Sequence, residues 1–229
     1  MLLSVYFLPH PPILLPTVGS PTDRAQLKKT LTALKKVGQE ISQIKPEIIV
    51  ISSPHQDWGI KVPWHFVNLK FKIQSYQTAE NFQITSKIPT AYPILTTLDS
   101  PQQHFLWGQK IAAQIPSKKR WVWLASGDMS HRLKEDGPYG LHPSGKKFDQ
   151  TLIKLLKDKA ADQILNLNPQ LVEEASECGL RSFCMGLGAL EASSQPWETE
   201  VLSYEAPFGV GYLVAHLKPN FKSNYKTKI

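Results

Sequence analysis

The chain has 229 residues, of which 41% are hydrophobic and 20% are charged. These values are ordinary for a folded domain and exclude a disordered chain, and no apolar run approaches the roughly 18 residues that a membrane helix needs. The formal net charge is +7, but the lysines are spread over predicted helix faces and turns, and no nucleic-acid-binding motif accompanies them. We therefore expect a protein that binds neither nucleic acid nor a membrane.

Length and cysteine content bound the domain organisation and the compartment. The simplest division is one domain over residues 1–217 followed by a basic tail over residues 218–229. The N-terminal segment lacks the basic residues of a secretory signal, so we expect no signal peptide. Two cysteines are too few for a disulfide framework and fit a reducing compartment, which predicts the cytoplasm. The sequence leaves the oligomeric state open, and a homo-oligomer is one of the options.

Two predicted strands near the N-terminus each end in a Pro-His pair. The apolar run at residues 2–8 leads into His10, which stands between prolines that restrict the backbone on both sides. A helix with apolar residues three and four apart follows over residues 20–45, and the β-branched run at residues 47–53 leads into His55. Strand, helix and parallel strand make a βαβ unit, so we expect both histidines at one edge of a sheet.

The rest of the chain continues the alternation of strands and helices. Residues 58–90 have alternating polarity, which predicts strands exposed on one side or a hairpin. Residues 92–98 are strand or loop. Helices are predicted at residues 102–115, 145–157, 169–177 and 182–192, and strands at residues 120–125, 200–204 and 211–217. These elements predict a single-domain α/β protein with a central, mostly parallel or mixed sheet and helices on both faces.

Polar residues also follow the later predicted strands. The strand at residues 120–125 leads into a segment that ends in His131, and Glu205 stands between the last two strands. Two imidazoles and one carboxylate on one face of an ion make the facial triad of non-haem Fe(II) oxygenases. Zinc hydrolases use the same two-His-one-Glu set. The donor types by themselves therefore predict a metal site but leave the metal open.

Four segments together carry a resemblance to a known family. They lie at residues 8–13, 53–55, 126–140 and 204–209. In this order they resemble the class III extradiol ring-cleaving dioxygenases. More narrowly, they resemble the branch of that family in which the catalytic subunit stands alone, a branch that is related to the Memo-like proteins. The resemblance runs from residue 2 to about residue 216.

The resemblance implies an Fe(II)-dependent extradiol dioxygenase that inserts O₂ into the ring of a catechol-like aromatic diol. It implies that His10, His55 and Glu205 bind the Fe(II), with zinc or another divalent metal as the alternative, and that His131 is the catalytic acid/base, a role that suits a histidine near neutral pH. Memo-like proteins share the fold but place a cysteine and a further histidine in the pocket, and the presence of Glu205 favours the dioxygenase. A non-catalytic Memo-like metal-binding or regulatory protein and a zinc-dependent hydrolase on the same ligands remain the alternatives.

Further residues are interpreted from their local setting. His216 lies within an apolar strand, which predicts a core histidine with its own partners rather than a ligand. Cys178 and Cys184 lack the spacing of metal ligands, so we interpret both as packing residues. Asp128, His142 and Arg181 are candidates for contacting the substrate or for supporting the metal ligands. The alternative is that Asp128 caps a turn, His142 is an ordinary loop residue and Arg181 is an ordinary surface residue.

Overall fold

A seven-stranded sheet forms the centre of the molecule, with the strand order β3-β4-β2-β5-β1-β7-β6. The computed structural model describes residues 1–221 except residues 68 and 87. Strands β1 to β5 pair in parallel, whereas β7 runs antiparallel to both β1 and β6. The strands are β1 (Leu2–Leu8), β2 (Ile48–Ser53), β3 (Lys72–Ile73), β4 (Thr90–Leu95), β5 (Trp121–Ser126), β6 (Trp197–Glu205) and β7 (Tyr212–Pro219).

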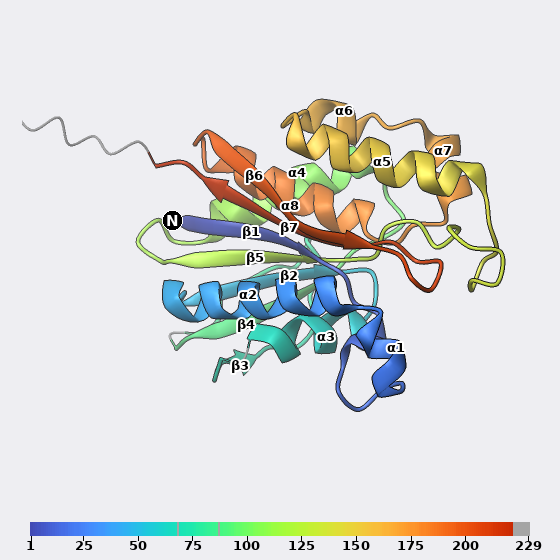
Figure 1. Ribbon diagram of the computed structural model, residues 1–229. Coiled ribbons are helices and arrows are strands. Elements are labelled where there is room, and N and C mark those ends of the chain that lie inside the picture. The colour runs from blue at the N-terminus through green and yellow to red at the C-terminus, as the bar shows by residue number, and fades with distance from the viewer. Residues whose placement is uncertain (68, 87, 222–229) are drawn as a thin grey trace, which may run out of the picture.

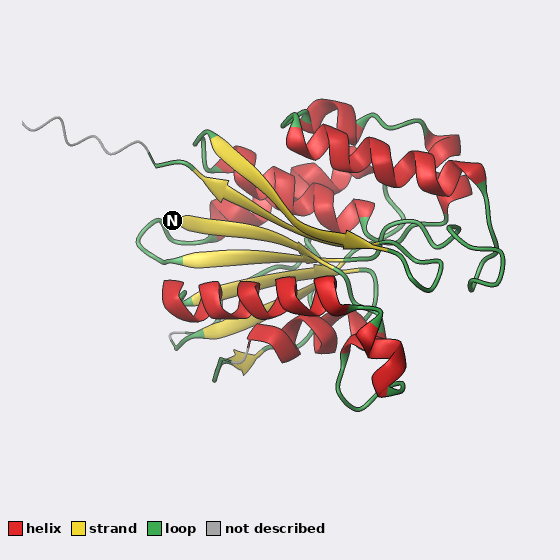
Figure 2. Cartoon of the chain, viewed as in Figure 1, coloured by secondary structure: helices red, strands yellow, loops and turns green. Residues whose placement is uncertain are grey.

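Helices cover both faces of this sheet (Figure 1). Helices α2 and α3 lie on one side of it and α4 and α8 on the other, and Figure 2 shows the strands between these two helical layers. The predicted α/β class with a mostly parallel, mixed sheet is therefore confirmed. The helices are α1 (Pro21–Ala25), α2 (Lys28–Ile44), α3 (Trp58–Val67), α4 (Pro101–Gln114), α5 (Pro143–Lys157), α6 (Ala161–Leu165), α7 (Pro169–Ala175) and α8 (Leu180–Ala192), with a short 3-10 turn η1 (Pro12–Leu14) after β1.

Alternate side chains of the central strands build two apolar cores. In β1, Val5 and Phe7 belong to the core against α4 and α8, and Tyr6 and Leu8 belong to the core against α2 and α3. Phe7 stacks on Phe183 of α8 with the ring centroids 4.4 Å apart. Because both faces are covered, these strands appear in the sequence as continuous apolar runs rather than as polar and apolar alternation.

Residues 58–90 fold differently from the strands predicted there. The first part forms helix α3, and of the expected strands only the two-residue β3 is present among the described residues. Ile60, Pro63 and Val67 of α3 are buried and lie three and four residues apart, on one helical face. Packing of this apolar face against the sheet outweighs the strand propensity of the segment.

Other elements also depart from the predictions. The helix predicted over residues 20–45 is divided into α1 and α2, and the short α6 is an additional helix. Strand β7 continues to Pro219, two residues into the predicted tail, of which residues 222–229 lie outside the described residues. No helix in the described part of the chain is long and apolar enough to cross a membrane.

Candidate metal centre

Three neighbouring parallel strands deliver polar side chains to one edge of the sheet. β5 lies between β1 and β2, and the carboxyl ends of all three strands lie side by side. His10 follows β1, His55 follows β2, and Asp128 and His131 follow β5. The rings of His10 and His55 meet edge to face with their centroids 5.1 Å apart. The βαβ unit thus brings together the two histidines as the sequence predicts.

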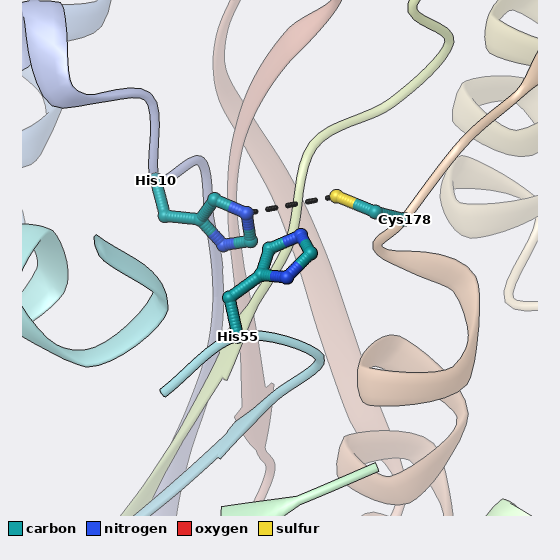
Figure 3. Close-up of side chains that lie close together, drawn as sticks. All are labelled: His10, His55 and Cys178. Atoms are coloured by element: carbon teal, nitrogen blue, oxygen red, sulfur yellow. Dashed lines mark hydrogen bonds between the residues drawn. The ribbon is translucent and has the colours of Figure 1, made fainter. Parts of the chain in front are cut away.

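A cysteine from the loop before α8 completes this group. Cys178 precedes α8, and its Sγ points toward the ring of His10, 3.6 Å from Nε2 (Figure 3). One ligand atom from each of His10, His55 and Cys178 lies within 4.8 Å of the others. Asp128, His131 and Cys178 form a second group by the same measure. Four side chains with metal-binding atoms therefore gather around the sulfur of Cys178.

Two glycines allow the loop that carries Cys178 to reach the end of β5. A Cβ atom on Gly127 would lie 2.1 Å from the Cα atom of Gly179, so neither loop has room for a side chain at their crossing. The backbone N–H of Gly179 donates to the carbonyl of Asp128 at 2.9 Å, and the backbone N–H of Asp128 donates to Sγ of Cys178 at 3.3 Å. These contacts fix the position of the thiol relative to the strand end.

Hydrogen bonds orient two of the imidazole rings. Nδ1 of His10 lies 3.0 Å from Oγ of Ser126, and the backbone N–H of His10 donates to Oδ1 of Asp128 at 2.9 Å. Nδ1 of His131 is hydrogen-bonded to the carbonyl of Ser176. With Nδ1 engaged, Nε2 is the nitrogen left for an ion, which is the usual arrangement of a metal-binding histidine.

Burial controls the charge of the group. His10 and Asp128 are each 4% exposed. Burial, with the neighbouring His55 and His131, lowers the pKa of His10 to about 3. Burial also raises the pKa of Asp128 to about 6, and burial together with Asp128 raises the pKa of Cys178 well above its ordinary value. A bound cation reverses this preference, because its charge stabilises a thiolate and a carboxylate in contact with it.

Glu205, the predicted third ligand, lies at the end of β6 and outside both groups. Its Oε1 accepts a hydrogen bond from the backbone N–H of Thr30 at 2.8 Å. This N–H belongs to the first turn of α2, where a negative charge interacts favourably with the helix dipole. The contact gives the carboxylate of Glu205 a structural partner.

His142 and Arg181 also lie outside the two ligand groups. His142 is the N-cap of α5 and accepts a hydrogen bond from the backbone N–H of Ser144 at 3.3 Å. Arg181 donates from Nε to the carbonyl of Asp99 at 2.9 Å and lines a cavity of about 540 Å³ between α4, α7 and α8. Asp128, by contrast, lies inside the second group and also supports the backbone of His10.

Sequence reasoning misses Cys178 and Ser126. Cys178 has no histidine or second cysteine at a metal-ligand spacing, and its contacts with the strand ends arise only in the folded chain. The local signal that was available is a Cys-Gly pair immediately before a predicted helix. Ser126 closes the apolar strand β5, and nothing in its neighbours indicates that its hydroxyl faces His10.

The chain is similar to a bacterial protein sequence and to a solved structure. Protein CA_C1420 of Clostridium acetobutylicum is 29% identical to it in an alignment of 278 positions, which covers 97% of this chain but 59% of that protein. The chain thus spans about three fifths of the length of that relative. The crystal structure of the uncharacterized protein JW3007 from Escherichia coli K12 matches with a TM-score of 0.53 and 15% identity over 94% of this chain and 99% of that one, which shows a shared fold.

A family model matches the larger part of the chain. Residues 56–215 match the catalytic LigB subunit of aromatic ring-opening dioxygenase. Asp128, His131 and Cys178 lie within the matched range, and His10 and His55 precede it. The resemblance to the extradiol dioxygenase catalytic subunits is therefore confirmed at the level of the family, and this chain belongs to the LigB family.

Proposed function

We propose that this protein is a metal-binding member of the LigB family whose ion is held by His10, His55 and Cys178. The observation that carries the proposal is the position of the Cys178 Sγ, 3.6 Å from Nε2 of His10 and within reach of His55. Two imidazoles and a thiolate suit zinc and other borderline or soft metals. Three protein ligands also leave a coordination position open.

The thiol favours the Memo-like alternative over the dioxygenase. An oxygen-activating facial triad needs a carboxylate as its third ligand, and the carboxylate of Glu205 is hydrogen-bonded to the first turn of α2 instead. Memo-like proteins place a cysteine and a further histidine in the pocket. Cys178 and His131, which lie close together, would supply that pair here, and this supports a metal-binding or regulatory role.

The residues beside the open position can handle a proton. His131 has its Nδ1 held by the carbonyl of Ser176, which leaves Nε2 free to accept and return a proton. Its ring meets Tyr139 at a centroid distance of 5.4 Å, which restricts its orientation. The ion, when bound, supplies Lewis acidity at this position. The chain contributes the orientation of the rings, with His10 and Asp128 buried and His55 exposed to solvent.

A second candidate function is the Fe(II)-dependent ring opening of a catechol-like diol with O₂. Two observations favour it: the LigB match contains Asp128 and His131, and Oδ2 of Asp128 lies 3.8 Å from Nε2 of His10. Asp128 would then take the carboxylate role that the sequence assigns to Glu205. His131 would serve as the acid/base for the diol protons.

Anaerobic reconstitution separates these functions. The chain is loaded with Fe(II) or Zn²⁺, the bound metal is quantified, and each form is mixed with a panel of catechols and O₂. Tight binding without a coloured ring-opened product is the result that we expect. A coloured product from the Fe(II) form alone would establish the dioxygenase, and ester or amide hydrolysis by the Zn²⁺ form without O₂ would establish the hydrolase. Failure to bind either metal would refute all three functions.

A further inference from the structure

We propose that Asp128, His131 and Cys178 form a second cation site, which shares the Cys178 sulfur with the first and removes His131 from proton transfer when it is filled. The inference rests on the proposed function, because it requires an ion on His10, His55 and Cys178. Its basis is that the two ligand groups are distinct except for this one sulfur.

Each of the two remaining ligands has an atom available for a second ion. Oδ1 of Asp128 is engaged by the backbone N–H of His10, whereas Oδ2 accepts no hydrogen bond from the residues that the structure describes. Nδ1 of His131 is hydrogen-bonded to the carbonyl of Ser176, and its Nε2 has no hydrogen-bond partner among the described residues. A carboxylate oxygen, an imidazole nitrogen and a thiolate are all ordinary ligands of zinc and cobalt.

The burial of Asp128 gives a second reason for this site. Asp128 is 4% exposed, and a buried carboxylate is normally paired with a cation or bound to a metal. Its nearest candidate partner is the imidazole of His10 at 3.8 Å. With its Nδ1 on Oγ of Ser126 and its Nε2 on the first ion, His10 has no N–H left to donate to Oδ2 of Asp128. A second cation would bind Oδ2 directly and give this buried carboxylate oxygen the partner that such atoms normally have.

The shared sulfur makes the second site the weaker of the two. A thiolate that already binds one cation has less charge to offer to another, and two cations held by one sulfur repel each other. The first ion therefore binds at low metal concentration and leaves His131 free as a proton carrier. At higher concentration the second ion occupies Nε2 of His131, and proton transfer through this ring stops. The second site would make the protein sensitive to excess metal.

Cobalt titration tests the proposal without an activity assay. Co²⁺ is added to the full chain, the bound metal is counted by equilibrium dialysis, and thiolate-to-cobalt absorption is followed. We expect wild type to bind two equivalents, the second more weakly, with both steps changing the thiolate band. His131→Asn and Asp128→Asn should each lose the second equivalent and keep the first. His65→Asn, which changes an exposed histidine on α3, should keep both.

The outcomes separate this inference from the proposed function. If wild type binds one equivalent, which His55→Asn abolishes and His131→Asn leaves unchanged, the second site is refuted and the first stands. If wild type binds no Co²⁺, both are refuted. Two equivalents that survive both His131→Asn and Asp128→Asn would place the second ion elsewhere and also overturn the inference. Circular dichroism of each variant shows that the loss of an equivalent is not a loss of fold.

Discussion

Two histidines close to β1, one that follows the strand and one in the paired strand β7, show why only one of them is a candidate ligand. His216 of β7 pairs with Tyr6 in the sheet and stacks on its ring at 4.5 Å. Its Nε2 lies 3.0 Å from Oγ of Ser4, and its Nδ1 lies 3.5 Å from Oε2 of Glu40. Both ring nitrogens have partners, and burial lowers the pKa of His216 to about 4.

His10 is more deeply buried than His216 and lacks the full set of partners that His216 has. Its Nδ1 has Ser126, whereas its Nε2 faces the Cys178 sulfur and the oxygen of Asp128, with His55 beside them. Burial by itself therefore does not identify a ligand. What distinguishes the candidate metal centre is a buried nitrogen that is oriented from one side and left open toward other donor atoms.

The largest expected difference between the two histidines concerns metal affinity. His10→Ala removes a ligand and should weaken binding by more than about a hundredfold, because the loss of a residue that merely orients a ligand already costs about 10- to 100-fold. His216→Gln is the matched change in the neighbouring strand β7 and should leave the dissociation constant unchanged. Isothermal titration with Zn²⁺ measures both. Equal losses of Zn²⁺ affinity in the two variants would show that the different partners of His10 and His216 do not decide which of them binds metal.

A second pair of variants distinguishes Cys178 from Glu205 as the third ligand. Cys178→Ser should abolish the thiolate-to-cobalt absorption and weaken Co²⁺ binding strongly. Glu205→Gln should leave both unchanged and reduce the free energy of unfolding by about 0.5 kcal/mol, since it removes a negative charge from the N-terminus of α2. Denaturant titration gives the stability change. Loss of metal binding in Glu205→Gln would restore Glu205 as a ligand and contradict the site described above.

The serines that hold the two histidines give a smaller, graded effect. Ser126→Ala removes the partner of Nδ1 in His10, so metal affinity should fall by about tenfold through misorientation of the ring. Ser4→Ala removes the corresponding partner of His216 and should not change metal affinity. A titration with Zn²⁺ measures both variants. An unchanged affinity in Ser126→Ala would mean that Ser126 does not orient the ligand.

A prediction that is separate from metal binding is a pH dependence of stability that comes from Asp149 of α5. Burial raises the pKa of Asp149 from 3.8 to about 7, so the folded chain holds one more proton than the unfolded chain between these pH values. The free energy of unfolding of wild type, relative to Asp149→Asn, should therefore fall as pH rises from about 4 to about 7. Urea titration of both proteins across this range tests the sign. A difference that rises with pH would contradict it.

The parts of the fold and site that could be predicted are those encoded by continuous segments. Runs covered on both faces identify β1, β2 and β5, and the polar residues that follow them identify the edge where His10, His55, Asp128 and His131 lie. The rule that parallel strands end at one edge is enough to bring these residues near one another. It does not indicate which donor atoms face an ion.

The parts of the fold and site that could not be predicted from the sequence depend on contacts between distant segments. Cys178 reaches the site because Gly127 and Gly179 let two loops cross, and this contact joins residues that are about fifty positions apart in the sequence. Glu205 fits the polar pattern of a strand end but lies on the far side of β7, where the first turn of α2 is its partner. In α3, packing against the sheet decides the structure of a segment whose polarity alternates.

X-ray absorption spectroscopy of the chain loaded with one equivalent of Zn²⁺ tests the central claim most directly. If His10, His55 and Cys178 hold the ion, the first coordination sphere contains one sulfur at about 2.3 Å and nitrogen ligands at about 2.0–2.1 Å. The sulfur contribution should disappear in Cys178→Ser and persist in Glu205→Gln. A coordination sphere of nitrogen and oxygen alone in the wild-type chain would contradict the account.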